Sequence, residues 1–364
     1  MRVLFLLEHF YPYIGGAEEL FINLASGLVK RGHKVVVVTT KYDSSLPKHE
    51  FIDGVEIRRV SCFNRYLFTL FAIPSAVKYA VNADIIQTTS YNSAIPAFLA
   101  GLIRGKKVII TFHEVWGSLW HKLPFTDRWK LNLFRLFEKL ILRLPFRKYV
   151  AVSKSTMGSL QDNGVERSKI EVIYNGIDYS RFEQFRYDPP VVFTYCYFGR
   201  LGISKGLDLL IEGSALFFAE HPQARLKLII PTYPRVIFKK VIELINRHGI
   251  SDRVTLLHDL AKDELYKEIS ESSCVMIPSI SEGFCFVAAE SAGLGIPVIT
   301  SGRGSLKEVV SGKLIEIEEL NAFGIREALK LALKGQWSYR EPVRFSLNES
   351  VERYIELYEK VNSN

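Results

Sequence analysis

Short apolar runs alternate with segments of helical periodicity along the whole chain, and this alternation limits the possible folds more than any other feature. Strands without polar alternation are buried on both faces, and helices between them place such strands in a parallel sheet covered by helices. The sequence therefore predicts an α/β protein. The expected strands are residues 2–7, 34–40, 55–60, 83–89, 107–113, 149–153 and 170–175, followed by 191–198, 224–231, 253–258, 273–279 and 297–301.

The length of 364 residues indicates two domains, because a domain typically spans about 100–200 residues. Residues 182–190, FEQFRYDPP, carry two prolines and no periodicity, which is typical of a linker. We therefore expect one domain over residues 1–185 and a second over residues 186–345. The remaining residues, 346–364, have apolar side chains at helical spacing and predict an amphipathic terminal helix.

The composition excludes several classes of protein. Apolar residues make up 48% of the chain and charged residues 24%, as in soluble globular proteins. The four cysteines contain no CxxC pair and are too few for a disulfide scaffold, so we expect reduced thiols. No apolar run reaches the ~18–20 residues that span a bilayer, and the N-terminus lacks the features of a signal peptide. We expect a cytoplasmic protein.

The net charge of +8 is confined to the first half of the chain. Residues 1–185 hold 25 basic and 16 acidic residues, whereas the remainder is close to neutral. Much of the excess lies in residues 116–148, where basic and aromatic side chains interleave at helical spacing. Such a helix either docks on an anionic membrane surface, here the inner face of the cell membrane, or covers the core with a solvated basic side. Nucleic acid is the weaker interpretation, because no nucleic-acid-binding motif is visible.

Three loops that follow expected strands carry candidate binding residues. Gly15 and Gly16 precede a helix after the first strand, where glycines allow close approach of a phosphate or sugar; a simple turn explains them equally well. No G-x-G-x-x-G motif occurs, which argues against a dinucleotide-dependent dehydrogenase. Arg200 and Lys205 lie in a Gly-rich loop and could grip a diphosphate, although basic loops are also common on solvated surfaces.

The third loop, SEGFCFVAAE, places Glu282 before an expected helix start at residues 283–286 and Glu290 on that helix. Free amides at a helix start attract phosphate, and carboxylates accept hydrogen bonds from sugar hydroxyls. A hydrolytic pair is disfavoured, because eight helical residues span about 12 Å and glycosidase pairs need about 5–9.5 Å. The alternative is two ordinary acids of an amphipathic helix. His113 ends another expected strand and is either functional or structural.

Together these pieces resemble the retaining glycosyltransferases of family 4. The resemblance runs through nearly the whole chain, and the paired glutamates together with the FGRL…KG loop are its most specific part. The matching motifs are GGAE at 15–18, His113 with Glu114, VAVSKST at 150–156, NGID at 175–178, FGRL…KG at 198–206, Glu282 with Glu290, and GIPVITSGRGSLKEVV at 295–310.

The resemblance implies the GT-B architecture, with two Rossmann-like, doubly wound parallel-sheet domains facing a cleft. The first domain would be the acceptor side, the second would hold the donor, and the terminal helix would return to the first domain. The implied reaction is a metal-independent, retaining transfer of a sugar from a nucleotide-sugar, with UDP or GDP as the nucleotide, to a sugar or a lipid-linked acceptor. No separate cofactor is expected.

The resemblance also assigns roles to the candidate residues. Arg200 and Lys205 would neutralise the leaving diphosphate and Glu290 would hold the ribose. As catalytic residues, Glu282 would contact the transferred sugar and His113 would face it. The remaining donor contacts would come from Gly15, Gly16, Gly283, Phe284, Cys285 and Phe286. Cys285 stands where the family commonly has Gly.

Two other classes of function remain open from the sequence. A non-catalytic nucleotide-sugar sensor or scaffold would keep Arg200, Lys205 and Glu290 but would not need Glu282 and His113; both are present, which favours the enzyme. A nucleotide-sugar epimerase with the same architecture would isomerise a sugar without an acceptor and fits the family-wide match less well.

Overall fold

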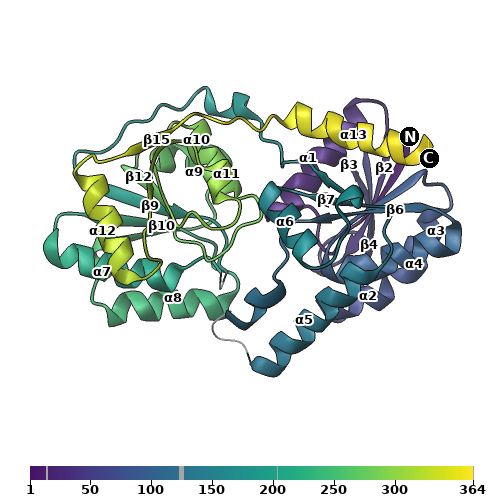
Figure 1. The fold of residues 1–364 in the computed structure, drawn as a ribbon, viewed down its shortest axis with the longest axis horizontal. Coiled ribbons are helices and arrows are strands. Elements are labelled where there is room, and N and C mark those ends of the chain that lie inside the picture. Colours follow the sequence, from purple (N-terminus) through teal and green to yellow (C-terminus); the bar gives the residue numbers. More distant parts are fainter. Residues whose placement is uncertain (14, 123–126, 203, 364) are drawn as a thin grey trace. The chain divides into compact units, whose positions relative to one another are not determined.

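The structure is a computed structural model that describes residues 1–13, 15–122, 127–202 and 204–363. The chain folds into two compact units, each built on its own sheet with helices packed around it (Figure 1). Unit 1 contains the described residues of 1–122, 127–176 and 345–363, and unit 2 contains those of 177–344. The chain therefore passes between the units at residue 177 and again at residue 345.

Unit 1 has an eight-stranded sheet with the order β3-β4-β2-β1-β5-β6-β7-β8. All neighbouring strands are parallel except β3 and β4. The order reverses between β1 and β5, since β2 and β4 lie on one side of β1 and the later strands on the other. The strands are β1 (Arg2–Leu6), β2 (Lys34–Thr40), β3 (His49–Ile52), β4 (Val55–Val60), β5 (Ile85–Thr89), β6 (Lys107–Phe112), β7 (Lys148–Ala151) and β8 (Ile170–Val172).

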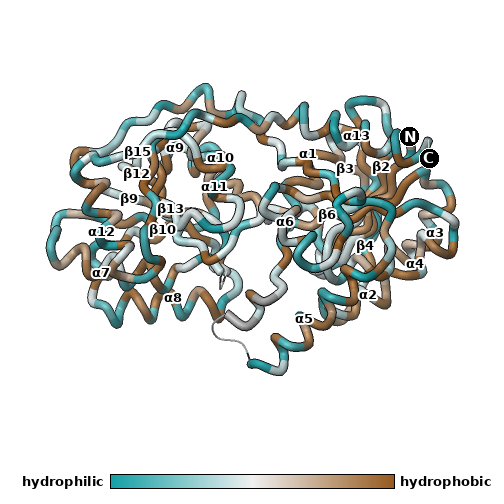
Figure 2. Tube along the Cα trace, in the orientation of Figure 1, coloured by the Kyte–Doolittle hydropathy of each residue, from teal (hydrophilic) through white to brown (hydrophobic). Residues whose placement is uncertain are grey.

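Helices connect the strands of this sheet and shield its apolar residues. Figure 2 colours much of the central strands brown, as expected for strands buried on both faces. Phe5 of β1 illustrates the packing: it is fully buried and meets the ring of Phe21 edge to face at 5.3 Å. The helices are α1 (Gly16–Lys30), α2 (Phe68–Phe71), α3 (Ile73–Ala80), α4 (Ala94–Arg104), α5 (Arg128–Arg143), α6 (Lys154–Asp162) and α13 (Leu347–Ser363).

Unit 2 has a seven-stranded sheet with the order β11-β10-β9-β12-β13-β14-β15, and only the β14–β15 pair is antiparallel. Its order reverses between β9 and β12. The strands are β9 (Thr194–Phe198), β10 (Arg225–Ile229), β11 (Val254–Leu257), β12 (Cys274–Ile277), β13 (Val298–Thr300), β14 (Gly312–Glu316) and β15 (Ser338–Arg340). The helices are α7 (Leu207–Glu220), α8 (Arg235–Arg247), α9 (Lys262–Ser270), α10 (Phe286–Gly293), α11 (Leu306–Val309) and α12 (Ala322–Leu333).

The prediction of two doubly wound parallel-sheet α/β domains is confirmed, and each expected apolar run holds a strand. Three strands were not predicted, namely β3, β14 and β15. They are short and rich in polar or charged residues, and β3 and β15 are antiparallel edge strands that need no apolar side on both faces. Asp53 and Gly54 between β3 and β4 both have positive φ, as in a tight hairpin turn, so the Asp-Gly pair was the missed signal.

The terminal helix α13 belongs to unit 1 and packs against α1. Gly27 of α1 makes this close approach possible, because a Cβ there would lie 2.6 Å from the Val351 side chain. The Nε of Arg31 donates to Glu352 at 2.5 Å along the same contact. Tyr354 and Tyr358 of α13 are fully buried, so the amphipathic face seen in the sequence covers core rather than solvent.

Among the described residues, no helix combines the length and the hydropathy that crossing a bilayer requires.

Candidate functional site

The loop that follows β9 in unit 2 holds Arg200 and Lys205, and its glycines fix its path. Gly206 has φ +67 and begins α7, and a Cβ at this position would lie 2.1 Å from the carbonyl oxygen of Pro278. The amide of Ile280 also donates to the carbonyl of Ser204 at 2.7 Å. The loops after β9 and β12 are thereby joined at the point where the strand order reverses, which is where open α/β sheets bind ligands.

Lys205 and Glu282 form an ion pair at this point. The Nζ of Lys205 lies 2.7 Å from Oε1 of Glu282, and the hydroxyl of Ser279 donates to the same oxygen at 2.7 Å. The Lys205 side chain is 22% exposed and that of Glu282 is 8% exposed. Burial lowers the pKa of Lys205, but the Glu282 carboxylate outweighs it and raises that pKa above its ordinary value. Lys205 is therefore a fixed ammonium group, held beside the other residue predicted to face the transferred sugar.

The backbone of Glu282 is held by the loop after β13. The amide of Ser305 donates to the carbonyl of Glu282 at 3.0 Å. Gly304 has φ +61, and a Cβ there would lie 2.4 Å from that same carbonyl oxygen. Ser279 and Gly304 thus position Glu282, and neither was assigned a role from the sequence. The signal for Gly304 was its place in a Gly-rich loop directly after an expected strand.

Substituting Gly304 tests this support. Gly304→Ala forces the new Cβ against the Glu282 backbone, so we expect it to lower the free energy of unfolding by about 2–4 kcal/mol and to displace Glu282. Gly295→Ala is the matched control, because Gly295 has a similar φ of +71 but nothing within 4 Å of a Cβ. Urea unfolding of both variants isolates the steric part; equal losses in the two would contradict the close contact.

The helix α10 begins later than the sequence predicted. We expected its N-terminus at residues 283–286, but the helix begins at Phe286, with Cys285 as the preceding cap residue. Cys285 has φ +71, a left-handed conformation in which a non-glycine residue is strained and which ends the helical geometry there. Gly283 and Phe284 therefore lie in the preceding loop. The ring of Phe284 meets that of Phe286 at 5.2 Å, and burial raises the pKa of the Cys285 thiol well above its ordinary value.

Glu290 lies on α10 and has a buried tyrosine as a partner. The hydroxyl of Tyr266 from α9 donates to Oε1 of Glu290 at 3.1 Å, and Tyr266 is only 3% exposed. The ring of Tyr266 stands perpendicular to that of Phe182 at 5.1 Å, which fixes its orientation. Tyr266 therefore orients Glu290. Nothing in the sequence marked it, because it is an isolated aromatic residue on an amphipathic helix.

Removing the hydroxyl of Tyr266 tests this role. We expect Tyr266→Phe to weaken nucleoside diphosphate binding about threefold to tenfold, because a less ordered Glu290 forms weaker hydrogen bonds with a ribose. Tyr187→Phe is the control: the hydroxyl of Tyr187 donates to the carbonyl of Ser273 at 2.8 Å, a backbone group rather than a site carboxylate. Calorimetry with UDP and GDP measures both variants; an equal effect of the two would remove Tyr266 from the site.

In unit 1, the loop residues Gly15 and Gly16 begin α1, with Gly15 as the cap and Glu18 and Glu19 in the first turn. His113 directly follows β6, and its ring meets that of Phe21 from α1 at 6.2 Å. This contact brings His113 next to the helix that the glycines begin. The two candidate segments of unit 1 are thus neighbours at the carboxyl ends of its strands.

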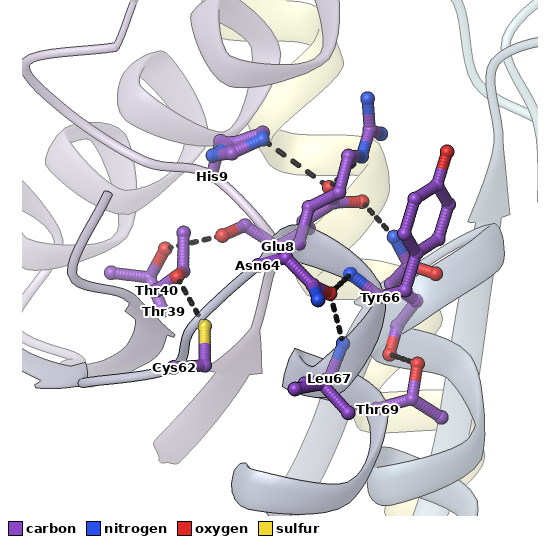
Figure 3. A network of polar contacts seen from close by, with 11 residues as sticks. Glu8, His9, Thr39, Thr40, Cys62, Asn64, Tyr66, Leu67 and Thr69 are labelled. Atoms are coloured by element: carbon purple, nitrogen blue, oxygen red, sulfur yellow. Dashed lines mark hydrogen bonds and ion pairs between the residues drawn. The ribbon is translucent and has the colours of Figure 1, made fainter.

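A further polar cluster lies where the strand order of unit 1 reverses, and the sequence did not reveal it (Figure 3). We call Glu8, His9, Arg65 and Asn92 the switch-point cluster. Glu8 is 8% exposed and has three partners: Nε of Arg65 at 2.7 Å, Nδ2 of Asn92 at 2.9 Å and Nε2 of His9 at 3.3 Å. Burial raises the pKa of Glu8, but His9 and Arg65 outweigh it and hold that pKa below its ordinary value.

The switch-point cluster borders aromatic and exposed groups. The ring of His9 stacks on that of Tyr13 at 4.2 Å, and Tyr42 meets both rings edge to face. The Arg65 side chain is 58% exposed, so its terminal nitrogens face solvent beside the buried carboxylate. Such a mixture of carboxylate, guanidinium and aromatic rings suits a hydroxyl-rich ligand. The missed signal was position: Glu8 and His9 directly follow the first expected strand, and Asn92 follows the fourth.

No group of three or more His, Cys, Asp or Glu side chains that could hold a metal ion occurs in the described part of the chain.

Two family models match the chain side by side. "Glycosyltransferase Family 4" matches residues 14–181, and "Glycosyl transferases group 1" matches residues 181–348. The first match holds Gly15, Gly16 and His113, and the second holds Arg200, Lys205, Glu282 and Glu290. Both groups of predicted site residues therefore fall inside regions that define the family.

Curated relatives are similar over most of the chain. The phosphatidylinositol N-acetylglucosaminyltransferase of Arabidopsis thaliana has one subunit that is 22% identical over 344 residues, which are 92% of this chain and 74% of the relative. A GDP-mannose:cellobiosyl-diphosphopolyprenol alpha-mannosyltransferase of Xanthomonas campestris is 26% identical over 82% of this chain and 78% of the relative.

Solved structures of low sequence identity share the fold. The sucrose-phosphate synthase of Thermosynechococcus elongatus has a TM-score of 0.77 at 20% identity and covers 100% of this chain, with 96% of its own chain covered. Anabaena Alr3699/HepE in complex with UDP-glucose has a TM-score of 0.72 at 18% identity, with 99% and 100% covered. With these matches and the two Rossmann-like sheets, the chain belongs to the family 4 glycosyltransferases of GT-B architecture.

Proposed function

We propose that this glycosyltransferase moves a sugar from a UDP- or GDP-activated donor to a lipid-linked acceptor at a membrane surface, with retention of configuration and without a metal ion or a separate cofactor. The observation that carries the proposal is the buried Lys205–Glu282 pair at the switch point of unit 2, in the same loop as Arg200. This group has the charges that a nucleotide-sugar diphosphate and a sugar hydroxyl require.

Lys205 and Arg200 act on the leaving group. When the bond between the sugar and the diphosphate breaks, negative charge develops on the diphosphate oxygens. An ammonium group that is already fixed in a poorly solvated place stabilises this charge without reorganising solvent. Arg200 is exposed and adds a second cation from the same loop, with a planar guanidinium suited to phosphate oxygens.

Glu282 and Glu290 hold the donor through its hydroxyls. Glu282 accepts hydrogen bonds from the transferred sugar while Ser279 and the loop at Gly304 keep it in place. Glu290, oriented by Tyr266, accepts from the ribose hydroxyls. Donor phosphates lie near the amide groups at the start of α10, where the helix dipole favours negative charge. His113 and the loop at Gly15 and Gly16 supply the contacts of unit 1.

The identity of donor and acceptor draws on the relatives. One relative is named for GDP-mannose and a diphosphopolyprenol-linked acceptor, another for phosphatidylinositol, and one similar structure holds UDP-glucose. The hydroxyl-rich part of the acceptor would contact the switch-point cluster, because Glu8 accepts and Arg65 and Asn92 donate hydrogen bonds there. A cytoplasmic enzyme peripheral to the inner face of the cell membrane fits such an acceptor.

A donor panel tests the proposal. The purified protein is incubated with UDP-, GDP- and ADP-sugars and a lipid extract, and release of nucleotide is followed together with the glycolipid product. We expect one donor to be consumed only when extract is present, and the product to keep the anomeric configuration of the donor by NMR. Tight nucleotide-sugar binding without turnover would support a sensor instead, and acceptor-independent isomerisation would support an epimerase.

A further inference from the structure

The helix α5 of unit 1 has two apolar faces. Its buried residues, Leu131, Glu138, Ile141 and Leu142, face the core of the unit. Trp129, Leu133, Leu136 and Leu140 are 65%, 55%, 65% and 49% exposed. Their spacing of four, three and four residues aligns them along one side, about half a turn from Glu138. A soluble helix needs only one apolar side, so the second is left without a partner in the described structure.

The exposed side corrects what residues 116–148 predicted. Neither a fully solvated basic side nor a uniform aromatic face is present. Trp116 and Trp120 pack inward around Glu138, and Ile141 is buried. The exposed apolar residues are instead the four on α5, of which Leu136 was not among those expected. Residues 123–126, with the expected Phe125, lie outside the described residues.

The apolar surface continues onto a neighbouring segment. Tyr66 of the turn Arg65–Leu67 stacks on Phe134 of α5 at 6.4 Å with an angle of 17° between the rings. Tyr66 itself is 58% exposed, and Phe63, Leu70 and Phe71 around it are 91%, 61% and 45% exposed. Two segments far apart in the sequence thus join in one patch. We call these four residues and the four of α5 the apolar patch.

The charges beside the apolar patch are almost all positive. Arg128, Lys139 and Arg143 are exposed and flank the stripe on α5, and Lys130 is exposed on its other side, paired with Asp127 at 2.7 Å. The one glutamate of the helix, Glu138, is 1% exposed and accepts hydrogen bonds inside the unit. The surface of α5 therefore combines insertable apolar side chains with flanking cations, which is the composition that binds an anionic lipid surface.

We propose that the apolar patch and its flanking cations dock unit 1 on an anionic phospholipid membrane, with Trp129 and the three leucines inserted at the level of the headgroups. A second copy of the chain is the other conceivable occupant. The one-sided excess of positive charge opposes it, because two such patches facing each other would repel. This docking is independent of turnover, so it can hold or fail separately from the proposed transfer reaction.

Vesicle flotation of the full chain tests the docking. The vesicles contain phosphatidylcholine and phosphatidylglycerol in equal parts, or phosphatidylcholine alone. We expect the protein to float with the anionic vesicles and at least about tenfold less with the neutral ones. The variant W129S/L133S/L136S should lose binding to both. The charge variant K139Q/R143Q should bind the anionic vesicles about 30-fold more weakly, with little further change in high salt.

The control is L102S/I103S, which removes two apolar side chains of α4 that are 70% and 58% exposed in the same unit. We expect this variant to bind like the parent protein. Circular dichroism and light scattering accompany each variant. Absence of flotation with the parent protein would overturn the proposal, as would equal losses in L102S/I103S and W129S/L133S/L136S. A dimer that W129S/L133S/L136S converts to a monomer would assign the patch to a second copy instead.

Discussion

Replacing Lys205 with Ala is expected to lower turnover by about 100-fold to 1,000-fold, because it removes a fixed positive charge from the place where the leaving diphosphate becomes negative. The affinity for UDP or GDP should fall by about 1.5–3 kcal/mol, the worth of charge-assisted hydrogen bonds to the phosphate oxygens. Lys205→Arg should recover part of both, since the charge remains but the planar guanidinium does not reproduce the ammonium that lies 2.7 Å from Glu282.

The matched control is Lys227→Ala in the same unit. Lys227 also forms a partly buried ion pair, with its Nζ 2.8 Å from Oε2 of Glu268, and its side chain is 16% exposed. Both variants should therefore lose similar amounts of stability in urea unfolding, while only Lys205→Ala loses nucleotide affinity in calorimetry. Unchanged affinity in Lys205→Ala would place the diphosphate elsewhere and remove the main support of the proposed function.

The hydrophobic pattern predicted the fold because both sheets are buried on two faces. Runs such as residues 34–40 have no polar alternation, and only a central parallel strand places every residue of such a run in the core. The same logic misses β3 and β15, which lie at sheet edges and alternate or lack apolar residues. Edge strands form through pairing with a neighbour, and a hydrophobic pattern does not record that pairing.

The candidate site was predictable where its residues follow strands and unpredictable where they support one another. Lys205 and Glu282 were marked individually by their loops, but their ion pair joins residues 77 positions apart and depends on how β9 and β12 align. Tyr266 supports Glu290 from a different helix, so no local motif contains both. The start of α10 was placed too early because the left-handed conformation of Cys285 is not a property that its residue type predicts.

Glu138 shows the same limit in the charge pattern. In the sequence it is one acid within a strongly basic segment and is expected to be solvated. In the structure it is 1% exposed and each of its oxygens accepts two hydrogen bonds. Oε1 accepts from the hydroxyl of Tyr91 at 3.0 Å and the amide of Trp116 at 2.9 Å. Oε2 accepts from the amide of Gly117 at 2.8 Å and Nε1 of Trp120 at 3.1 Å.

Glu138→Ala is therefore expected to be the most destabilising single substitution proposed for unit 1. It leaves four donors around a small cavity, and an unsatisfied buried donor costs about 1–3 kcal/mol. Partial entry of water recovers some of this, so we expect the free energy of unfolding to fall by about 4–5 kcal/mol. Urea unfolding at neutral pH measures the loss, and turnover should fall as well, because the loop held by Glu138 begins three residues after His113.

Two variants separate the possible causes. Glu138→Gln keeps one acceptor oxygen but turns an amide NH2 toward two donors, so its loss should be intermediate if hydrogen bonding dominates. Leu136→Ala on the exposed side of the same helix controls for helix propensity and should change the free energy of unfolding by less than about 0.5 kcal/mol. If Glu138→Ala cost no more than Leu136→Ala, the carboxylate would not hold the loop. If it costs what four unsatisfied donors require, one helix fixes the loop after β6 with its inner side while its outer side stays free to meet a membrane.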